Sequence, residues 1–220
     1  METEDLLDAL VADLKPVRRA PRPMMQLAVW IALSVPALAI VTAIMGPRPE
    51  LSALFRQPGF LAAEGFALAT GVISAYVAFC AGRPDQPGWK LLLPPVLLVA
   101  WLMELGRQCL ALSVQHVSGV FAVHMDPLCL PAIALAGIVP ALAMVTQLRP
   151  TTAFRPMHAC FCGALAAAAL AETALRLFHA EPSFASLLVW QMGSVALFTL
   201  AAGAIGQVVV TRHRRSLTFA

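Results

Sequence analysis

Soft and titratable side chains gather around one loop near the middle of the chain. Cys109 and Cys129 enclose nineteen residues. In an oxidising compartment the two could form a disulfide, and closing such a loop contributes about 3 kcal/mol in the chain-entropy model. Thiolate and thioether sulfur also suit Cu(I), and Cys109 could equally pack as a small apolar side chain, so all three alternatives stay open. The set comprises Cys109, His116, His124, Met125, Cys129 and, further along, His179.

A second cluster, His158-Ala-Cys160-Phe-Cys162, has the composition of a metal site. On a helix, Cys160 would lie about 200° around the axis from His158, so three ligands could not converge on one ion. We therefore interpret these residues, and the isolated Cys80, as core packing. This cluster is therefore not predicted to bind a metal, no metal ligands are assigned in the chain, and no cofactor is expected.

Five charged residues fall inside or at the edges of long apolar stretches. Oppositely charged residues three or four positions apart on a helix can neutralise each other. Glu104 with Arg107 and Glu172 with Arg176 have this spacing. These groups, together with Glu64, could form a proton or substrate path of a transporter. Interhelical pairing is the favoured interpretation. Phosphate-binding, dinucleotide, HExxH and Ser/His/Asp motifs are missing from the sequence, so we do not expect an enzyme.

Long apolar stretches dominate the chain, which is 60% hydrophobic and only 12% charged. Soluble domains carry about 25% charged residues. About 20 apolar residues in a helix cross a bilayer, and six stretches reach that length. The fold class predicted is therefore all-α, a polytopic membrane protein with a six-helix bundle. The predicted spans are 24–45, 60–81, 91–112, 128–148, 157–178 and 186–209.

Basic residues predict the orientation of these spans. With the N-terminus inside, eleven Lys and Arg fall on the cytoplasmic side and four on the outer side, a clear positive-inside bias. Both termini are thus expected in the cytoplasm. The net charge of +3 comes from short basic clusters between the apolar stretches, and these clusters indicate orientation in the membrane. Direct nucleic-acid binding is therefore not expected. A signal peptide ending near Ala39 is an alternative for the first span, but the apolar run continues to Met45.

Residues 1–23 form a cytoplasmic tail before the membrane domain at 24–210, and residues 211–220 form a basic tail after it. Within 1–23, apolar residues at helical spacing make one stripe and acidic residues fill the other faces. Helices that lie on lipid carry Lys and Arg instead, so the pattern favours a protein partner over the bilayer. The candidate binding residues are Leu6, Leu7, Leu10, Val11 and Leu14, with Asp5 and Asp8 beside them.

Several segments together resemble the NrsF family, whose members are six-span anti-sigma factors of the bacterial inner membrane. The resemblance covers nearly the whole chain and includes the Cys109 and Cys129 pair. The segments are TEDLLDALVADLKPVRR (3–19), RPDQPGWKLLLPP (83–95), LRPTTAFRP (148–156) and LFHAEPSFASLLVWQMGSVAL (177–197).

The resemblance implies that residues 1–19 sequester an extracytoplasmic-function sigma factor, and that a signal from the envelope releases it. Membrane lipid is then the other partner, and a small-molecule substrate is not expected. Several members carry a Cys directly after the residue that matches His179, whereas this chain has Ala180. Redox sensing through a disulfide at that position therefore does not carry over. A small ion-coupled transporter remains the alternative function.

Overall fold

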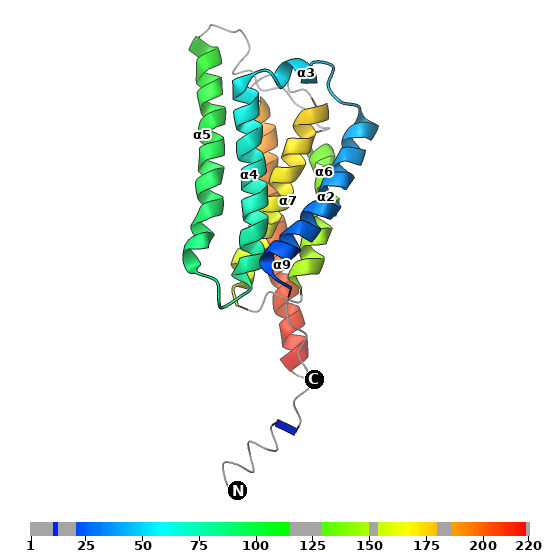
Figure 1. Ribbon diagram of the computed structural model, residues 1–220, viewed down its shortest axis with the longest axis vertical. Helices are drawn as coiled ribbons and strands as arrows, with labels where there is room; N and C mark the ends of the chain where they lie inside the picture. Colours follow the sequence, from blue (N-terminus) through cyan, green and yellow to red (C-terminus); the bar gives the residue numbers. More distant parts are fainter. Residues whose placement is uncertain (1–10, 13–20, 115–128, 150–153, 180–185, 219–220) are drawn as a thin grey trace.

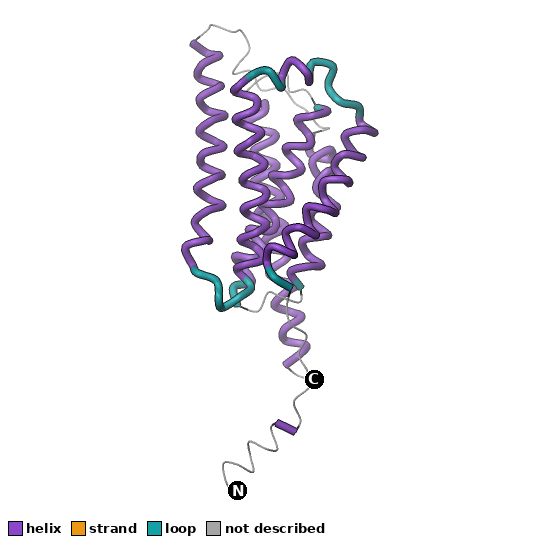
Figure 2. Tube along the Cα trace, viewed as in Figure 1, coloured by secondary structure: helices purple, strands orange, loops and turns teal. Residues whose placement is uncertain are grey.

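The computed structural model describes residues 11–12, 21–114, 129–149, 154–179 and 186–218, and every regular element within them is helical (Figures 1 and 2). Two of the α-helices follow another kind of helix without a break: Leu93–Val114 follows a 3-10 helix, and Gly193–Thr218 follows a π-helix. The elements are α2 (Pro23–Met45), α3 (Leu51–Leu54), α4 (Pro58–Ala81), η1 (Gly88–Leu92), α5 (Leu93–Val114), α6 (Cys129–Leu148), α7 (Pro156–Phe178), η2 (Leu187–Met192) and α9 (Gly193–Thr218).

Six helices are long and apolar enough to cross a membrane, which confirms the predicted six-span, all-α architecture. Their bounds agree with the predicted spans to within about three residues. Proline starts three of them, at Pro23, Pro58 and Pro156, where its missing N–H costs no hydrogen bond. The helix α9 continues to Thr218, through most of the basic segment after the last span.

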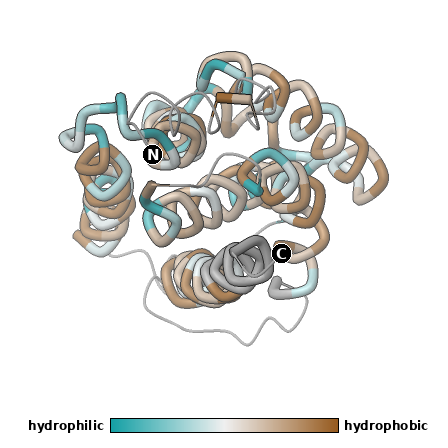
Figure 3. The backbone as a smooth tube through the Cα atoms, turned by 90° about the horizontal axis from the view of Figure 1, so that it is seen from below, coloured by the Kyte–Doolittle hydropathy of each residue, from teal (hydrophilic) through white to brown (hydrophobic). Residues whose placement is uncertain are grey.

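The centre of the bundle is formed by α7 and α4. In the most apolar window of each span, 67% of α7 and 50% of α4 are buried, against 17% of α5 and 18% of the last span. Small residues let the two central helices approach closely, since a Cβ on Gly71 of α4 would lie 3.5 Å from the backbone oxygen of Ala166 in α7. Figure 3 shows the spans side by side, seen along the bundle.

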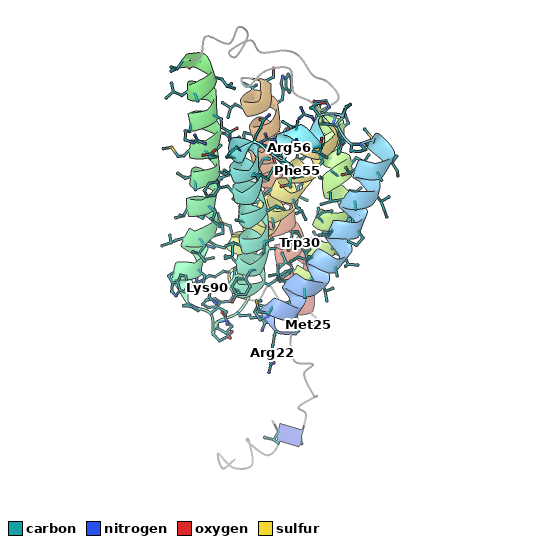
Figure 4. All side chains as sticks on the ribbon, turned by 45° about the horizontal axis from the view of Figure 1, so that its top comes forward. Arg22, Met25, Trp30, Phe55, Arg56 and Lys90 are labelled. Atoms are coloured by element: carbon teal, nitrogen blue, oxygen red, sulfur yellow. The ribbon has the colours of Figure 1, made fainter. Side chains whose placement is uncertain are left out.

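The bundle has two distinct ends (Figure 1). The start of α2, the η1 loop and the end of α9 lie at one, which we call the inner end; α3 and the end of α7 lie at the other, the outer end. Figure 4 shows Arg22 and Lys90 at the inner end and Phe55 and Arg56 at the outer end. The first and last spans therefore open onto the same side, as an even number of crossings requires.

The helix α2 is fastened to α6 by two side chains. Nε1 of Trp30, which is completely buried, donates to the backbone oxygen of Pro140 at 2.9 Å. Nearer the inner end, Nε2 of Gln26 donates to the backbone oxygen of Gln147 at 3.3 Å. A donor in an apolar span must find a partner inside the protein, so these two bonds fix the position of α2 against α6.

Candidate functional site

A buried ion pair joins the two central helices near the outer end. Nε of Arg176 in α7 lies 3.0 Å from Oε1 of Glu64 in α4, and the two side chains are 9% and 8% exposed. The guanidinium of Arg176 also lies 5.1 Å from the ring centre of Phe60, in cation–π geometry. Phe60 in turn meets Phe55 edge to face, with ring centres 5.7 Å apart. These contacts lock the start of α4 onto the end of α7.

Arg48 closes the outer end of α7 from the loop that follows α2. Its backbone N–H donates to the backbone oxygen of Leu177 at 3.0 Å, and its Nη1 donates to that of His179 at 3.4 Å. These are two carbonyls that a helix C-terminus leaves without an intrahelical donor. The same guanidinium pairs with Glu50 at 2.8 Å, and this hydrogen bond lowers the pKa of the Glu50 carboxyl. His179 thus lies at the C-cap of α7.

A second polar contact at the outer end belongs to α5. Glu104 pairs with Arg107 at 2.6 Å, and the Arg107 side chain is 63% exposed. Gln108 donates to Glu104 at 2.9 Å and to the backbone oxygen of Gly59 at 2.7 Å, which holds α5 against the start of α4.

Glu172, one turn before Arg176 on α7, is completely buried. The charged residues predicted within spans therefore all lie toward one end of the bundle.

The structure describes only some of the side chains predicted to gather around the loop between Cys109 and Cys129. Cys109 lies in α5 and is 9% exposed. Cys129 begins α6, but its side chain, like His116, His124 and Met125, lies outside the described residues. The bridge between Cys109 and Cys129 therefore stays a prediction.

The His158 cluster separates on α7 as its helical spacing indicates. His158 is exposed and Cys160 is buried. A Cβ on Gly206 of α9 would lie 3.2 Å from the Cys160 sulfur, so this thiol packs in the contact between α7 and α9. Among the described residues, no group of three His, Cys, Asp or Glu side chains could hold a metal ion.

At the inner end, Arg83 in the loop after α4 holds the chain where it enters α2. Its Nη2 donates to the backbone oxygen of Pro21 and, at 3.1 Å, to Oε1 of Gln26. Because Gln26 also binds Gln147, one network joins the start of α2 to the ends of α4 and α6. Sequence reasoning missed this network. A buried glutamine in an otherwise apolar span was the available signal, since such a side chain must find partners.

Lys90 is the second fixed cation of the inner end. Its Nζ donates to the hydroxyl of Tyr76 at 3.0 Å and to Oε1 of Gln86 at 2.7 Å, joining η1 to α4. Gln86 in turn donates to the carboxylate of Asp85 at 2.8 Å. The loop between α4 and α5 is therefore a structured element.

The proposed binding stripe is described only at Val11, which is helical and 61% exposed. The remaining stripe residues lie outside the described part of the chain. They are Leu6, Leu7, Leu10 and Leu14, together with Asp5 and Asp8.

Comparison with known proteins decides the family. The family model described as NrsF, negative regulator of sigma F, matches residues 10–212. The chain belongs to this family. The NrsF match takes in all six spans and the second half of the stripe, from Leu10 onward. No curated protein and no solved structure matches the chain significantly. As the family name indicates, this NrsF protein is a membrane-embedded negative regulator of a sigma factor, which points to a non-enzymatic role.

Proposed function

We propose that this chain is an anti-sigma factor of the bacterial inner membrane, which holds an extracytoplasmic-function sigma factor inactive through residues 1–19 and releases it on an envelope signal. The observation that carries the proposal is an acidic amphipathic segment, placed directly before the first span, in a family of negative regulators of a sigma factor. An isolated helix of three turns is marginal in water, so its apolar stripe needs a partner surface.

The chemistry of the segment suits a sigma factor. Sigma factors bind DNA, and surfaces that contact phosphates are basic. An acidic helix covers such a surface, while its apolar stripe enters a groove in the same partner. Val11, helical and exposed, leaves part of the stripe open for this contact. Bound in this way, the sigma factor cannot engage its polymerase or promoter.

The inner end of the bundle is assigned to the cytoplasm in this proposal. Basic residues at that end support the orientation, because Lys and Arg are retained on the cytoplasmic side of a membrane. Before α2 and between the spans, the described basic residues there are Arg22, Arg83, Lys90, Arg149 and Arg155. Outside the spans, Arg48 and Arg56 are the described basic residues of the outer end.

A signal at the outer end has a continuous structural route to the tail. The helix α4 carries Glu64, which pairs with Arg176, near its outer end. Immediately after its inner end comes Arg83, which binds the backbone of Pro21, close to the point where the tail joins α2. A displacement of α4 relative to α7 would therefore be passed through Arg83 to the end of the tail that joins α2.

Two substitutions in the stripe test the function. Leu7→Asp and Leu10→Asp each place a charge in the buried groove, which costs several kcal/mol without a partner for that charge. Both variants should lose the sigma factor in pull-downs of the intact protein, and the target genes should become constitutively active at a normal membrane level of the protein.

Ala12→Asp is the matched control, because position 12 lies about 170° around the helix from the centre of the stripe. It adds the same charge to the same segment and should leave binding intact. Retention of the sigma factor by both Leu variants would refute the binding stripe.

The alternative function, an ion-coupled transporter, has no specific observation in its favour. Glu64 and Glu104 each have an arginine within ion-pair distance. Two described cavities of about 340 and 180 Å³ between α6, α7 and α9 are lined almost entirely by apolar residues, and no acidic residue lines either. An ion-binding site would need oxygen ligands there.

A further inference from the structure

Three cations surround a small cavity at the inner end. Arg83, Lys90 and Arg155 line it, and they come from the loop after α4, from η1 and from the residue before α7. Arg155 lies beside Gly88, at a distance where a Cβ would be in ordinary van der Waals contact. A Cβ at Gly88 would lie 3.4 Å from Nη1 of Arg155. We call these three residues the basic cluster.

The basic cluster has too little negative charge around it. Its lysine donates to the neutral groups of Tyr76 and Gln86, and Arg155 stacks on the ring of Phe154. Within the described part of the chain, no carboxylate lies within ion-pair distance of any of the three cations. Before α2, from α4 to α5 and from α6 to α7, the described residues of the inner end include five basic side chains and the single acid Asp85, an excess of four positive charges.

The complementary charge lies on the chain itself. Residues 1–14 contain five acidic side chains and no Lys or Arg, and they are Glu2, Glu4, Asp5, Asp8 and Asp13. The chain that carries this segment enters the first span beside the cluster, because Arg83 binds the backbone oxygen of Pro21. From Pro21 back to Asp13, eight residues span at most about 26–29 Å when extended. Every carboxylate from Asp13 to Glu2 can therefore return to the cluster.

We propose that the acidic segment 2–13 docks on Arg83, Lys90 and Arg155 when no other partner holds it. Tethering gives the segment an effective concentration near the cluster in the millimolar range, which favours it over free anions. The docking itself does not depend on the identity of any partner. Its consequence rests on the proposed function: the sigma factor and the inner face of the bundle compete for the same carboxylates.

Amide hydrogen exchange of residues 2–13 tests the docking in the full-length protein, in nanodiscs of phosphatidylcholine with no sigma factor present. Exchange in the wild type should be slower than in a free peptide of residues 1–20. Arg155→Glu should speed it about fivefold, the loss expected for two weak ion pairs. Arg56→Glu, the same charge change at the outer end, should leave the rate unchanged.

Two further measurements distinguish a loss of docking from misfolding of the variant. Asp8→Arg combined with Arg155→Glu should slow exchange again relative to Arg155→Glu alone, because the charges are swapped. In the wild type, raising the salt concentration should speed exchange, since exposed pairs are screened.

The docking is refuted if the wild type exchanges like the free peptide, or if Arg155→Glu and Arg56→Glu behave alike. It is also refuted if slow exchange requires phosphatidylglycerol and ignores Arg155→Glu, because lipid would then hold the segment. Any of these results leaves the proposed function standing. Retention of the sigma factor by the two Leu variants would in turn leave the docking standing.

Discussion

Arg176 and Glu64 form a buried ion pair between α7 and α4, with Nε and Oε1 3.0 Å apart. They stand 112 positions apart in the sequence, so the pair forms only when the two central helices are correctly packed. Removing both charges from water is costly, and loss of either partner would leave the other charge buried and uncompensated. Arg176 is also in contact with Phe60, so the same guanidinium organises the start of α4.

The first prediction is that Arg176→Met destabilises the bundle by about 3–5 kcal/mol, because it leaves the Glu64 carboxylate buried without its partner. The double variant Glu64→Leu with Arg176→Met should recover most of this loss. Equilibrium unfolding in mixed detergent micelles measures both. Arg107→Met is the control: its partner is Glu104, but its side chain is 63% exposed, so the loss of stability should be much smaller than for Arg176→Met. Equal losses for Arg176→Met and Arg107→Met would contradict the buried character of the first pair.

A second prediction compares two buried tryptophans. Trp30→Phe removes the hydrogen bond from Nε1 to the backbone oxygen of Pro140 and should cost about 1 kcal/mol more than Trp101→Phe. Both rings are completely buried, and Nε1 of Trp101 has no hydrogen-bond partner among the described residues. The two changes therefore remove similar ring volume but only one bond. The same unfolding assay measures the difference, and an identical loss in both would argue against the link between α2 and α6.

Glycines in the helix contacts give a third prediction. A Cβ at Gly203 would lie 2.5 Å from the ring of Phe161, so the ring or one of the two helices must shift to make room. Gly203→Ala should therefore destabilise by about 1–3 kcal/mol, as overpacking does. At Gly65 a Cβ would meet nothing within 4 Å, so Gly65→Ala should stabilise α4 by about 0.5–1 kcal/mol. Apparent melting temperatures should shift in opposite directions.

The fourth prediction concerns orientation. Reporter fusions should place the inner end of the bundle in the cytoplasm and the outer end in the periplasm, following the basic residues. A periplasmic signal at Arg215 would overturn the assignment of both termini. Cytoplasmic readings are expected after Ala20, Pro87, Pro150 and Arg215, and periplasmic readings after Pro49, Gly119 and Ser183.

Hydropathy alone predicts the spans of this chain, because length and apolar composition are local properties. The proline at the start of α4 or α7 likewise marks a boundary that can be read directly. Contacts between helices are different. Spacing suggests Glu172 as a neighbour of Arg176, whereas the contact with Glu64 depends on which face of α4 meets α7. Helical periodicity is weak in these spans because lipid-facing and buried residues are both apolar, so the packed faces cannot be deduced.

The contacts at the inner end likewise cannot be deduced from the sequence. Arg83 counts only as one more cytoplasmic cation in the sequence, and nothing local reveals that it binds Pro21 and Gln26. Through Gln26 the network extends to Gln147, so it joins three separate segments that only the folded bundle brings together. A buried polar residue in a span, such as Gln26, signals that a partner exists without identifying it.

The small residues between α4 and α7 determine how this contact responds to force. Alanine and glycine have no side-chain rotamers, so forming the contact costs almost no side-chain conformational entropy. For the same reason, the contact has no alternative rotamers into which it can relax. Gly71 and Ala166 bring the two backbones together directly. A push at the Arg176 end of α7 therefore cannot be absorbed by side chains between the helices, and it must appear as a movement of whole helices at the other end.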